Sequence, residues 1–479
     1  MELLSPLDES FLHLETEYSQ MHIGSVAIFE GPPPPIGDVA AMVEAKLHRV
    51  PRYRQKVRFV PLALSRPRWA DDPHFQLGYH LRHTALPAPG SEAQLRTLIG
   101  RVMSQRLDRA RPLWEMWVIE GLGEGRWAIL SKIHHCMVDG IAGSDLITVI
   151  LDRERDAAPA PPAPWQAAPE APAAELVGRA LVERLTSPME IVRSAEAAVR
   201  APRAYGERLL DAAHGFAAMR GLVRRTPPLS INGPLGPHRR WAWARSRLTD
   251  VKAVRAGLGG TVNDVVLTVI TAGFRSLLVA RGEPVGDLVV RTLVPVSVRT
   301  PGQRGTYDNR VSAMFAELPI GIESPVERLE AVRAQMEHLK ASKEAVAGEV
   351  LTSLGGFAPP MLLALGERVA AHVGQRSVNT VTTNVPGPQY PLYAVGRRML
   401  EAFPYVPLGG NVRVGVAIFS YDGGLNFGVT GDYDTSEDLQ VLCDGIEAGL
   451  AELLAAASPA ARPARRRRAP APSRGSEAG

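Results

Sequence analysis

The chain has 479 residues, 45% of them hydrophobic and 22% charged, which is ordinary for a globular protein with room for more than one core. Its formal net charge is +4, but residues 458–479 hold six arginines and one glutamate, a local charge of +5 that leaves −1 for the rest. A nucleic-acid-binding fold carries its basic patch on the folded body, so this distribution argues against a nucleic-acid partner.

The first 155 residues alternate between short apolar runs and patterns of helical spacing. The expected strands are Ile23–Phe29, Trp114–Glu120 and Trp127–His135, and the expected helices are Asp38–Arg49, Glu92–Leu107 and Ala142–Leu151. The glycines of Gly121–Gly125 would join the last two strands as a hairpin. This order predicts an α/β lobe over residues 1–155.

The composition changes after this lobe. Residues 156–175 are rich in Ala and Pro and cannot build a core, which predicts a linker. Residues 176–225 are predicted to form Ala-, Leu- and Arg-rich helices, which either pack against the folded body or lie on a membrane or droplet surface. We therefore assign residues 156–230 to a linker with crossover helices.

Strand and helix patterns resume in residues 231–457, which predicts a second α/β lobe. The expected strands are Leu288–Val298, Val311–Leu318, Ser377–Asn384, Val412–Tyr421 and Leu425–Gly431, and the expected helices are Thr261–Ala280 and Ser436–Ala456. Thr261 and Asp264 have capping-box spacing, and Ser436 is the predicted N-cap of the last helix. Residues 458–479 are predicted to be a disordered tail, with attraction to anionic lipid as the alternative role.

The two cysteines, Cys136 and Cys443, fit neither a disulfide framework nor a zinc motif, and such usage is typical of a reducing compartment. The N-terminal sequence MELLSPLDESF contains acids and no apolar run, so we expect no signal peptide. No run approaches the ~20 apolar residues that cross a bilayer.

The segment SKIHHCMVDG (131–140) lies between a predicted strand and a predicted helix. Successive strand side chains point to opposite faces, so His134 and His135 should not act on the same atom. They cannot easily converge on one ion either, and we predict no metal site. Cys136 is a weaker candidate for an acylated nucleophile, because its side chain should point away from that of His135.

HHCMVDG (134–140) matches the HHxxxDG motif shared by chloramphenicol acetyltransferase, carnitine acyltransferases and nonribosomal-peptide condensation domains. Further segments resemble the bacterial wax ester synthase/acyl-CoA:diacylglycerol acyltransferase family, namely SPLDESFLHLE (5–15), MHIGSVAIFEG (21–31), Pro112-Leu113-Trp114, NGPLGPHRR (232–240), the Asn263-Asp264 pair and NVPGP (384–388). HHxxxDG alone is moderately specific, but these segments in this order are highly specific. The resemblance runs from about residue 3 to about residue 455.

This resemblance implies a two-lobed, chloramphenicol-acetyltransferase-like fold of the α/β class, with mixed sheets and a tunnel between the lobes. In the tunnel an acyl-CoA would meet diacylglycerol or a long-chain alcohol, giving triacylglycerol or wax ester. His135 matches the second histidine of the motif and would be the general base, and the acyl group would pass directly without an acyl-enzyme. Acyl-CoA is then a substrate, and no cofactor is implied.

The resemblance also implies roles for the other motif residues. His134 matches the supporting histidine, and Gly140 would allow a tight turn. Asp139 matches an acid that is structural in relatives, with Arg54 or Arg299 as candidate partners. The competing interpretation of Asp139 is simple N-capping of the next helix.

Asn263 lies in the first turn of a predicted helix, where backbone N–H groups favour negative charge. It would donate a hydrogen bond to a developing oxyanion or position His135, or it would only cap and pack the helix together with Asp264. Pro112-Leu113-Trp114 is interpreted as a packing segment that shapes the tunnel.

Two other functions stay open from the sequence. One is a condensation-type acyltransferase that uses a carrier-bound acyl group, which the family segments outside HHxxxDG disfavour. The other is a non-catalytic lipid-surface protein, which the intact motif disfavours. For the leading function we expect a cytoplasmic enzyme, peripheral to the inner face of the membrane or to lipid droplets.

Overall fold

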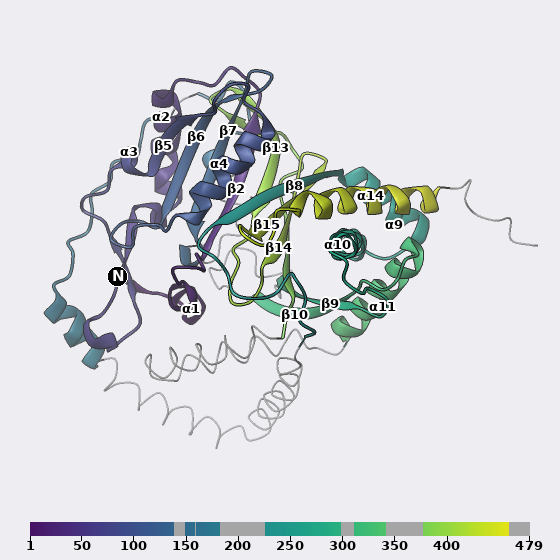
Figure 1. The fold of residues 1–479 in the computed structure, drawn as a ribbon. Helices are drawn as coiled ribbons and strands as arrows, with labels where there is room; N and C mark the ends of the chain where they lie inside the picture. Colours follow the sequence, from purple (N-terminus) through teal and green to yellow (C-terminus); the bar gives the residue numbers. More distant parts are fainter. Residues whose placement is uncertain (138–148, 159, 183–225, 298–310, 342–376, 459–479) are drawn as a thin grey trace, which may run out of the picture.

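A computed structural model describes residues 1–137, 149–158, 160–182, 226–297, 311–341 and 377–458. Within these residues, two six-stranded sheets form the centres of two α/β lobes, and a three-stranded sheet belongs to the first lobe (Figure 1). The predicted α/β class with mixed sheets is confirmed. The Arg-rich tail, most of the predicted crossover helices and most of the predicted helix Ala142–Leu151 lie outside the described residues.

The first half of the chain supplies most of the first lobe. Its elements are β1 (Glu2–Leu3), α1 (Pro6–Leu14), β2 (His22–Phe29), α2 (Ile36–Lys46), η1 (Leu47–Arg49), η2 (Pro51–Arg54), β3 (Gln55–Arg58), η3 (Pro61–Ala63), β4 (Arg68–Asp71), α3 (Leu77–His80), β5 (Leu81–Ala85), α4 (Glu92–Ser104), β6 (Trp114–Leu122), β7 (Arg126–His134) and η4 (His135–Met137). The large sheet has the order β12-β13-β2-β7-β6-β5, and the small one β1-β4-β3.

Different helices cover the two faces of the large sheet. In β2, Val26 and Ile28 pack with Ile99 of α4, whereas the alternate residues Ala27 and Phe29 pack with α2. Because strand side chains alternate, each residue of β2 and of its neighbour β7 is thereby assigned to the α4 face or to the α2 face. The same alternation determines which face of the sheet His134 faces.

The second half of the chain builds the second lobe. Its elements are β8 (Arg239–Arg247), α9 (Leu248–Leu258), α10 (Val262–Ala280), β9 (Val289–Ser297), β10 (Val311–Pro319), α11 (Pro325–Ala341), β11 (Thr380–Pro386), β12 (Tyr393–Ala394), β13 (Arg397–Tyr405), β14 (Val414–Tyr421), β15 (Gly424–Asp432) and α14 (Leu439–Ala457). The sheet order is β10-β9-β11-β14-β15-β8, with β11 parallel to both of its neighbours and the other pairs antiparallel.

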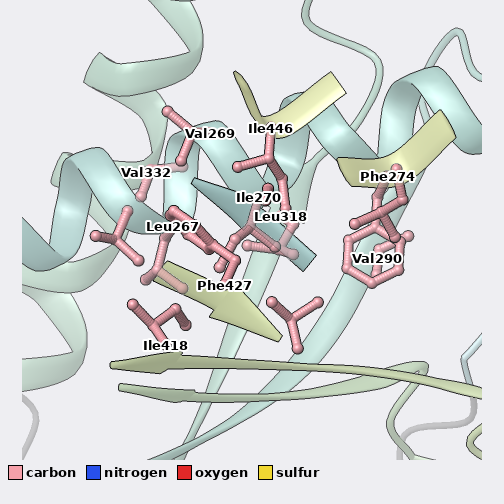
Figure 2. Packing of buried hydrophobic residues seen from close by; sticks show 14 of the residues in the cluster. Leu267, Val269, Ile270, Phe274, Val290, Leu318, Val332, Ile418, Phe427 and Ile446 are labelled. Carbon is pink, nitrogen blue, oxygen red and sulfur yellow. The ribbon is translucent and has the colours of Figure 1, made fainter. Parts of the chain in front are cut away.

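Helix α10 forms the centre of the second core. Figure 2 shows Leu267, Ile270 and Phe274 of α10 among side chains from the sheet and from α14. The two helices approach closely, because a Cβ atom on Gly445 would lie only 2.6 Å from the Ser276 hydroxyl oxygen. Among the described helices, α10 alone has the length and apolar composition to cross a membrane, but most of it is buried in this core.

Strands β12 and β13 depart from the domain boundaries expected from the sequence. Residues 393–405 complete the sheet of the first lobe, although they fall within the segment 231–457 assigned to the second. Where β13 meets β15, a Cβ atom on Gly428 would lie 1.7 Å from the carbonyl oxygen of Pro404. The second half of the chain therefore contributes two strands to the first lobe, and the two lobes meet at a tight backbone contact.

One predicted helix cap is confirmed and another is wrong. Thr261–Asp264 forms the predicted capping box at the start of α10. Helix α14 begins at Leu439, so Ser436 is not its N-cap. The N-cap is Asp438, whose carboxylate makes no cap bond and instead accepts hydrogen bonds from Arg281 at 2.5 and 2.7 Å.

Within the predicted linker segment 156–230, the described residues 160–182 lie against the first lobe. They lack regular structure up to residue 172 and are helical beyond it. Trp165 lies under the guanidinium of Arg54, 4.9 Å from the ring centroid, and Glu170 pairs with Arg58 at 2.8 Å. These contacts attach a segment that cannot form a core of its own.

Candidate functional site

His135 lies on the short turn η4, immediately after strand β7 ends at His134. Three consecutive backbone N–H groups hold this turn. That of His134 donates to the carbonyl of Leu113 (2.9 Å), and that of His135 to the carbonyl of Met21 (2.8 Å). That of Cys136 donates to Nδ1 of His134 (3.2 Å). The strand that we expected to end at His135 ends at His134 instead, because the backbone N–H of Cys136 turns back to bond the His134 side chain.

The imidazole of His135 is stacked on the ring of Phe11 in α1, with centroids 3.8 Å apart and planes inclined by 21°. Burial lowers the pKa of His135 to about 4, so the ring is neutral near pH 7. A neutral imidazole keeps one unprotonated ring nitrogen, and that lone pair is what a general base needs.

His134 faces the other side of the sheet. Its register partner is His22, which alternates with Val26 on the α4 face, and the two rings meet edge to face with centroids 5.9 Å apart. Because Nδ1 of His134 accepts the N–H of Cys136, the ring proton lies on Nε2. His135 stacks instead on Phe11, which packs against the core of the α2 face. The two histidines thus serve opposite faces, as strand alternation predicts.

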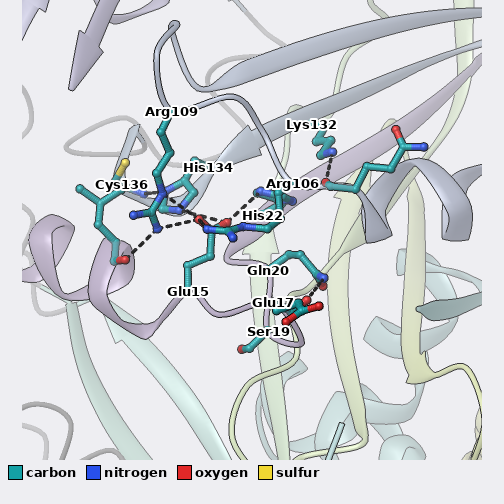
Figure 3. Close-up of polar contacts among 12 residues, drawn as sticks. Glu15, Glu17, Ser19, Gln20, His22, Arg106, Arg109, Lys132, His134 and Cys136 are labelled. Carbon is teal, nitrogen blue, oxygen red and sulfur yellow. Dashed lines mark hydrogen bonds and ion pairs between the residues drawn. The ribbon is translucent and has the colours of Figure 1, made fainter. Parts of the chain in front are cut away.

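The carboxylate of Glu15, directly after α1, lies between these buried histidines and two arginines (Figure 3). Its Oε1 is 3.2 Å from Nε2 of His22 and 3.7 Å from Nε2 of His134. Its Oε2 is 2.7 Å from Nη2 of Arg109 and 3.3 Å from Nη2 of Arg106. Burial alone would raise the pKa of Glu15, but the hydrogen bonds and charges of these partners lower it below its usual range, so the carboxylate is ionised.

The arginines supply the compensating charge for Glu15. Burial lowers the pKa of His22 to about 4 and that of His134 to about 3, so both rings are neutral near pH 7. Among the described residues, no group of three or more His, Cys, Asp or Glu side chains is arranged to hold a metal ion. At His134 the proton on Nε2 also occupies the lone-pair position that a metal ligand would need.

Sequence reasoning did not single out Glu15 or His22. Both lie in segments that carry the family resemblance, residues 5–15 and 21–31. The pairing of β2 with β7 places His22 opposite His134, but these strands are far apart in the sequence and no turn between them sets their register. The carboxylate could not be found from the sequence either, because its approach depends on how α1 packs.

Cys136 and Lys132 are buried beside the histidines but have other roles. Burial raises the pKa of the Cys136 thiol well above its usual value, which disfavours the thiolate needed for a nucleophile. Burial also lowers the pKa of Lys132 to about 8. Its ammonium donates to the carbonyls of Val102 (3.0 Å) and Gln105 (2.5 Å), so it caps the end of α4.

Asn263 lies in the first turn of α10, as predicted. Its Oδ1 accepts a hydrogen bond from Nδ2 of Asn384 in the NVPGP segment (3.4 Å), while Asp264 forms the capping box with Thr261. Within the described part of the chain, no hydrogen bond joins Asn263 to His135. The structure therefore brings two motif segments of the second lobe together and leaves the oxyanion role of Asn263 as a prediction.

Asp139, Gly140 and Arg299 lie outside the described residues, so their roles also stay predictions. Arg54 is described, and its guanidinium stacks over Trp165. Its pairing with Asp139 is therefore left untested.

Trp114 has the packing role that the sequence predicts for its segment. It is buried, its ring stacks between Tyr53 and His80, and its indole N–H donates to the carbonyl of Tyr53 (2.9 Å). Its neighbour Leu113 accepts the N–H of His134. The segment thus supports the turn that carries His135.

An apolar cavity lies on the His135 side of the sheet. Its lining residues are Ser25, Ala27, Phe29, Met116, Ile129, Ser131, Ile150 and Leu151. In β7, Ile129 and Ser131 share a face with Ile133, and His135 follows on the turn after the strand. The lining of the cavity is mostly hydrocarbon.

Comparisons with known proteins agree with the resemblance seen in the sequence. A family model described as the wax ester synthase/diacylglycerol acyltransferase catalytic domain matches residues 4–266, and the corresponding C-terminal domain matches residues 307–454. A Mycobacterium tuberculosis protein named "Probable diacyglycerol O-acyltransferase tgs1" is 36% identical over 457 residues, which is 95% of this chain and 96% of that protein.

Two solved structures show how widely the fold is shared. The wax ester synthase/diacylglycerol acyltransferase from Marinobacter aquaeolei VT8 matches with a TM-score of 0.66 and 27% identity, covering 95% of this chain and 99% of that one. The first condensation domain of the calcium-dependent antibiotic synthetase matches with a TM-score of 0.57 and 18% identity, covering 96% and 97%. The second likeness is one of fold alone.

Proposed function

The chain belongs to the wax ester synthase/diacylglycerol acyltransferase family, and from this premise we propose that it transfers a long-chain acyl group from acyl-CoA to the hydroxyl of diacylglycerol or of a long-chain alcohol. The acyltransferase activity follows from the family. The acceptor, the acyl length and the chemical role of each residue are the parts that the proposal adds.

In the proposed reaction, the unprotonated ring nitrogen of His135 takes the proton from the acceptor hydroxyl. The alcohol oxygen then forms a bond to the thioester carbonyl carbon, and the C–S bond breaks as the tetrahedral adduct collapses. The imidazolium returns its proton to the departing CoA thiolate, so the products are an ester and free CoA. The chain's own groups suffice for these proton transfers, and Asn263 is proposed to stabilise the oxyanion or to position His135.

The state of the His135 ring is the observation that carries this proposal. The ring is held by stacking on Phe11 and is neutral near pH 7, so one of its nitrogens keeps a lone pair. A base of lowered pKa is uncharged across the neutral range and is ready to accept a proton. The buried thiol of Cys136 is a poor competitor, which supports direct transfer.

The apolar cavity supports a long acyl chain as the transferred group. It lies on the same face of β7 as His135 and is lined mostly by carbon, with the hydroxyls of Ser25 and Ser131 as exceptions. We therefore expect palmitoyl-CoA to be used far better than acetyl-CoA.

The test is an assay of purified full-length protein with palmitoyl-CoA and either diacylglycerol or hexadecanol. Free CoA is followed with a thiol reagent and the ester is identified by mass spectrometry. His135→Asn should lose at least about a hundredfold in kcat, because an amide cannot accept the proton. His74→Asn, which changes an exposed histidine, is the matched control. Ester formation at the wild-type rate by a folded His135→Asn variant would refute the proposal.

We further propose that the protein meets its lipid substrates at a membrane or droplet surface from the cytoplasmic side. Diacylglycerol and long-chain alcohols partition into such surfaces, and α10, the apolar helix long enough to span, is occupied by core packing. Flotation with anionic and neutral vesicles checks this. Recovery of all the protein at the bottom of the gradient, under conditions where diacylglycerol is esterified, would contradict it.

A further inference from the structure

Helix α1 and its C-cap residue bring one side chain to each of the two motif histidines. Ser5 caps its N-terminus by accepting the N–H of Asp8. Phe11, in the last turn of α1, and Glu15, directly after the helix, both reach the end of β7. Phe11 stacks on His135, and Glu15 lies beside His134. The segment 5–15 therefore does more than pack.

The two oxygens of the Glu15 carboxylate have different partners (Figure 3). Oε2 accepts both Nε (3.1 Å) and Nη2 (2.7 Å) of Arg109, which also donates to the carbonyl of Leu12 (2.8 Å) and so ties itself to α1. Oε1 lies 3.2 Å from Nε2 of His22 and 3.7 Å from Nε2 of His134, within the range of an electrostatic interaction but without a hydrogen bond to either. Both imidazoles and the carboxylate are almost completely buried, so water does not screen this arrangement.

A buried carboxylate selects which nitrogen of a neighbouring imidazole carries the proton. At His134 the negative charge on the Oε1 side favours the proton on Nε2, which leaves Nδ1 as an acceptor. Nδ1 then accepts the N–H of Cys136, the residue that follows His135. The other tautomer would place an N–H at Nδ1 against the N–H of Cys136, and the turn η4 would lose this bond.

We propose that Glu15 is a positioning residue for His135, which acts by holding His134 in the Nε2–H tautomer and thereby fixing the turn η4. The inference rests on the proposed function, because it assigns Glu15 a role in the same reaction. His135 lies between two residues whose backbone N–H groups are both bonded, and the side chain of His134 supplies the second of these bonds. Glu15 itself touches neither substrate nor His135 in this scheme.

The first measurement is the tautomer itself. In ¹⁵N-histidine-labelled full-length protein, the His134 signals are assigned by their loss in His134→Asn. The wild type should show the proton on Nε2, and Glu15→Gln should show an increased share of the Nδ1–H form. A wild-type His134 that carries its proton on Nδ1 overturns the proposal, and so does a tautomer that Glu15→Gln leaves unchanged.

The second measurement is kinetic. Glu15→Gln should lower kcat at least about tenfold and leave the KM for palmitoyl-CoA within about twofold, since the base is displaced and the substrate contacts are not. His134→Asn offers an amide oxygen near the position of Nδ1 and has no tautomer to select. In that background Glu15→Gln should change kcat by less than about twofold, whereas a purely structural role of Glu15 predicts the same loss in both backgrounds.

Two controls separate this proposal from the proposed function. Glu120→Gln removes a carboxylate from another Glu–His pair, that of Glu120 and His83 at 2.7 Å on the exposed edge of the sheet, and should leave kcat unchanged. If His135→Asn is inactive and Glu15→Gln turns over as fast as the wild type, the positioning role alone fails. If His135→Asn keeps full activity, the proposed function fails first. Should Glu15→Gln not fold, the tautomer of the wild type still decides.

Discussion

Acidification is expected to destabilise the protein through its buried histidines. In the fold the pKa is about 4 for His22 and about 3 for His134, against about 6.5 in an unfolded chain. Between these values the unfolded chain binds protons that the folded protein does not. The stability is therefore unaffected above pH ~6.5 and falls as the pH drops from there toward the folded pKa values.

The expected loss is large. From pH 7 to pH 5, linkage gives about 2 kcal/mol for each histidine and about 4 kcal/mol for both. A folded domain typically has about 5–15 kcal/mol of stability in total. These two side chains therefore account for a substantial part of the acid sensitivity.

The assay is urea unfolding at pH 7 and pH 5, followed by tryptophan fluorescence. His134→Asn has no group to titrate at that position, so its loss between the two pH values should be smaller than that of the wild type by about 2 kcal/mol. His74→Asn, at an exposed position, should match the wild type. The reasoning is refuted if His134→Asn loses as much stability as the wild type over this interval.

Three further substitutions test other contacts. Phe11→Ala removes the stacking on His135, worth about 0.5–1.5 kcal/mol, and should lower kcat between about two- and tenfold. Phe11→Tyr keeps the aromatic ring and should keep the rate. Equal losses of kcat in the two variants would contradict this role of the ring. Cys136→Ser should keep kcat within about twofold, because burial holds the Cys136 thiol protonated. Complete loss of steady-state activity in a folded Cys136→Ser variant would argue for an acyl-enzyme. Gly428→Ala places a Cβ atom 1.7 Å from the carbonyl oxygen of Pro404 and should destabilise the protein by about 3 kcal/mol or more. The loss would be measured as a lower Tm. An unchanged Tm would show that β13 and β15 can separate freely.

Local patterns predicted much of the secondary structure. The apolar run of Thr261–Ala280 with its capping box, the hairpin around Gly423 and the strand that begins at Trp114 all depend on neighbours close in sequence. The predicted helix cap at Ser436 was wrong, because α14 begins at Leu439 and its N-cap is Asp438, whose carboxylate pairs with the distant Arg281.

The candidate base could also be identified from the sequence. The HHxxxDG motif pointed to His135, and strand alternation correctly separated its side from that of His134. Residues 138–148, with Asp139 and Gly140, lie outside the described part of the chain. Their predicted roles therefore rest on the motif alone.

What the amino-acid sequence determined by itself was the class of the fold, the family and the histidine that is the best candidate for the base, because these are encoded in short-range periodicity and in one compact motif. Tertiary structure alone decided that β13 joins the sheet of the first lobe and that Glu15 reaches His22 and His134. Both depend on contacts between segments far apart in sequence, including β13 with β2 and Arg109 with Glu15. No local pattern records such contacts, because their energy comes from burial and charge pairing that exist only once the chain has folded.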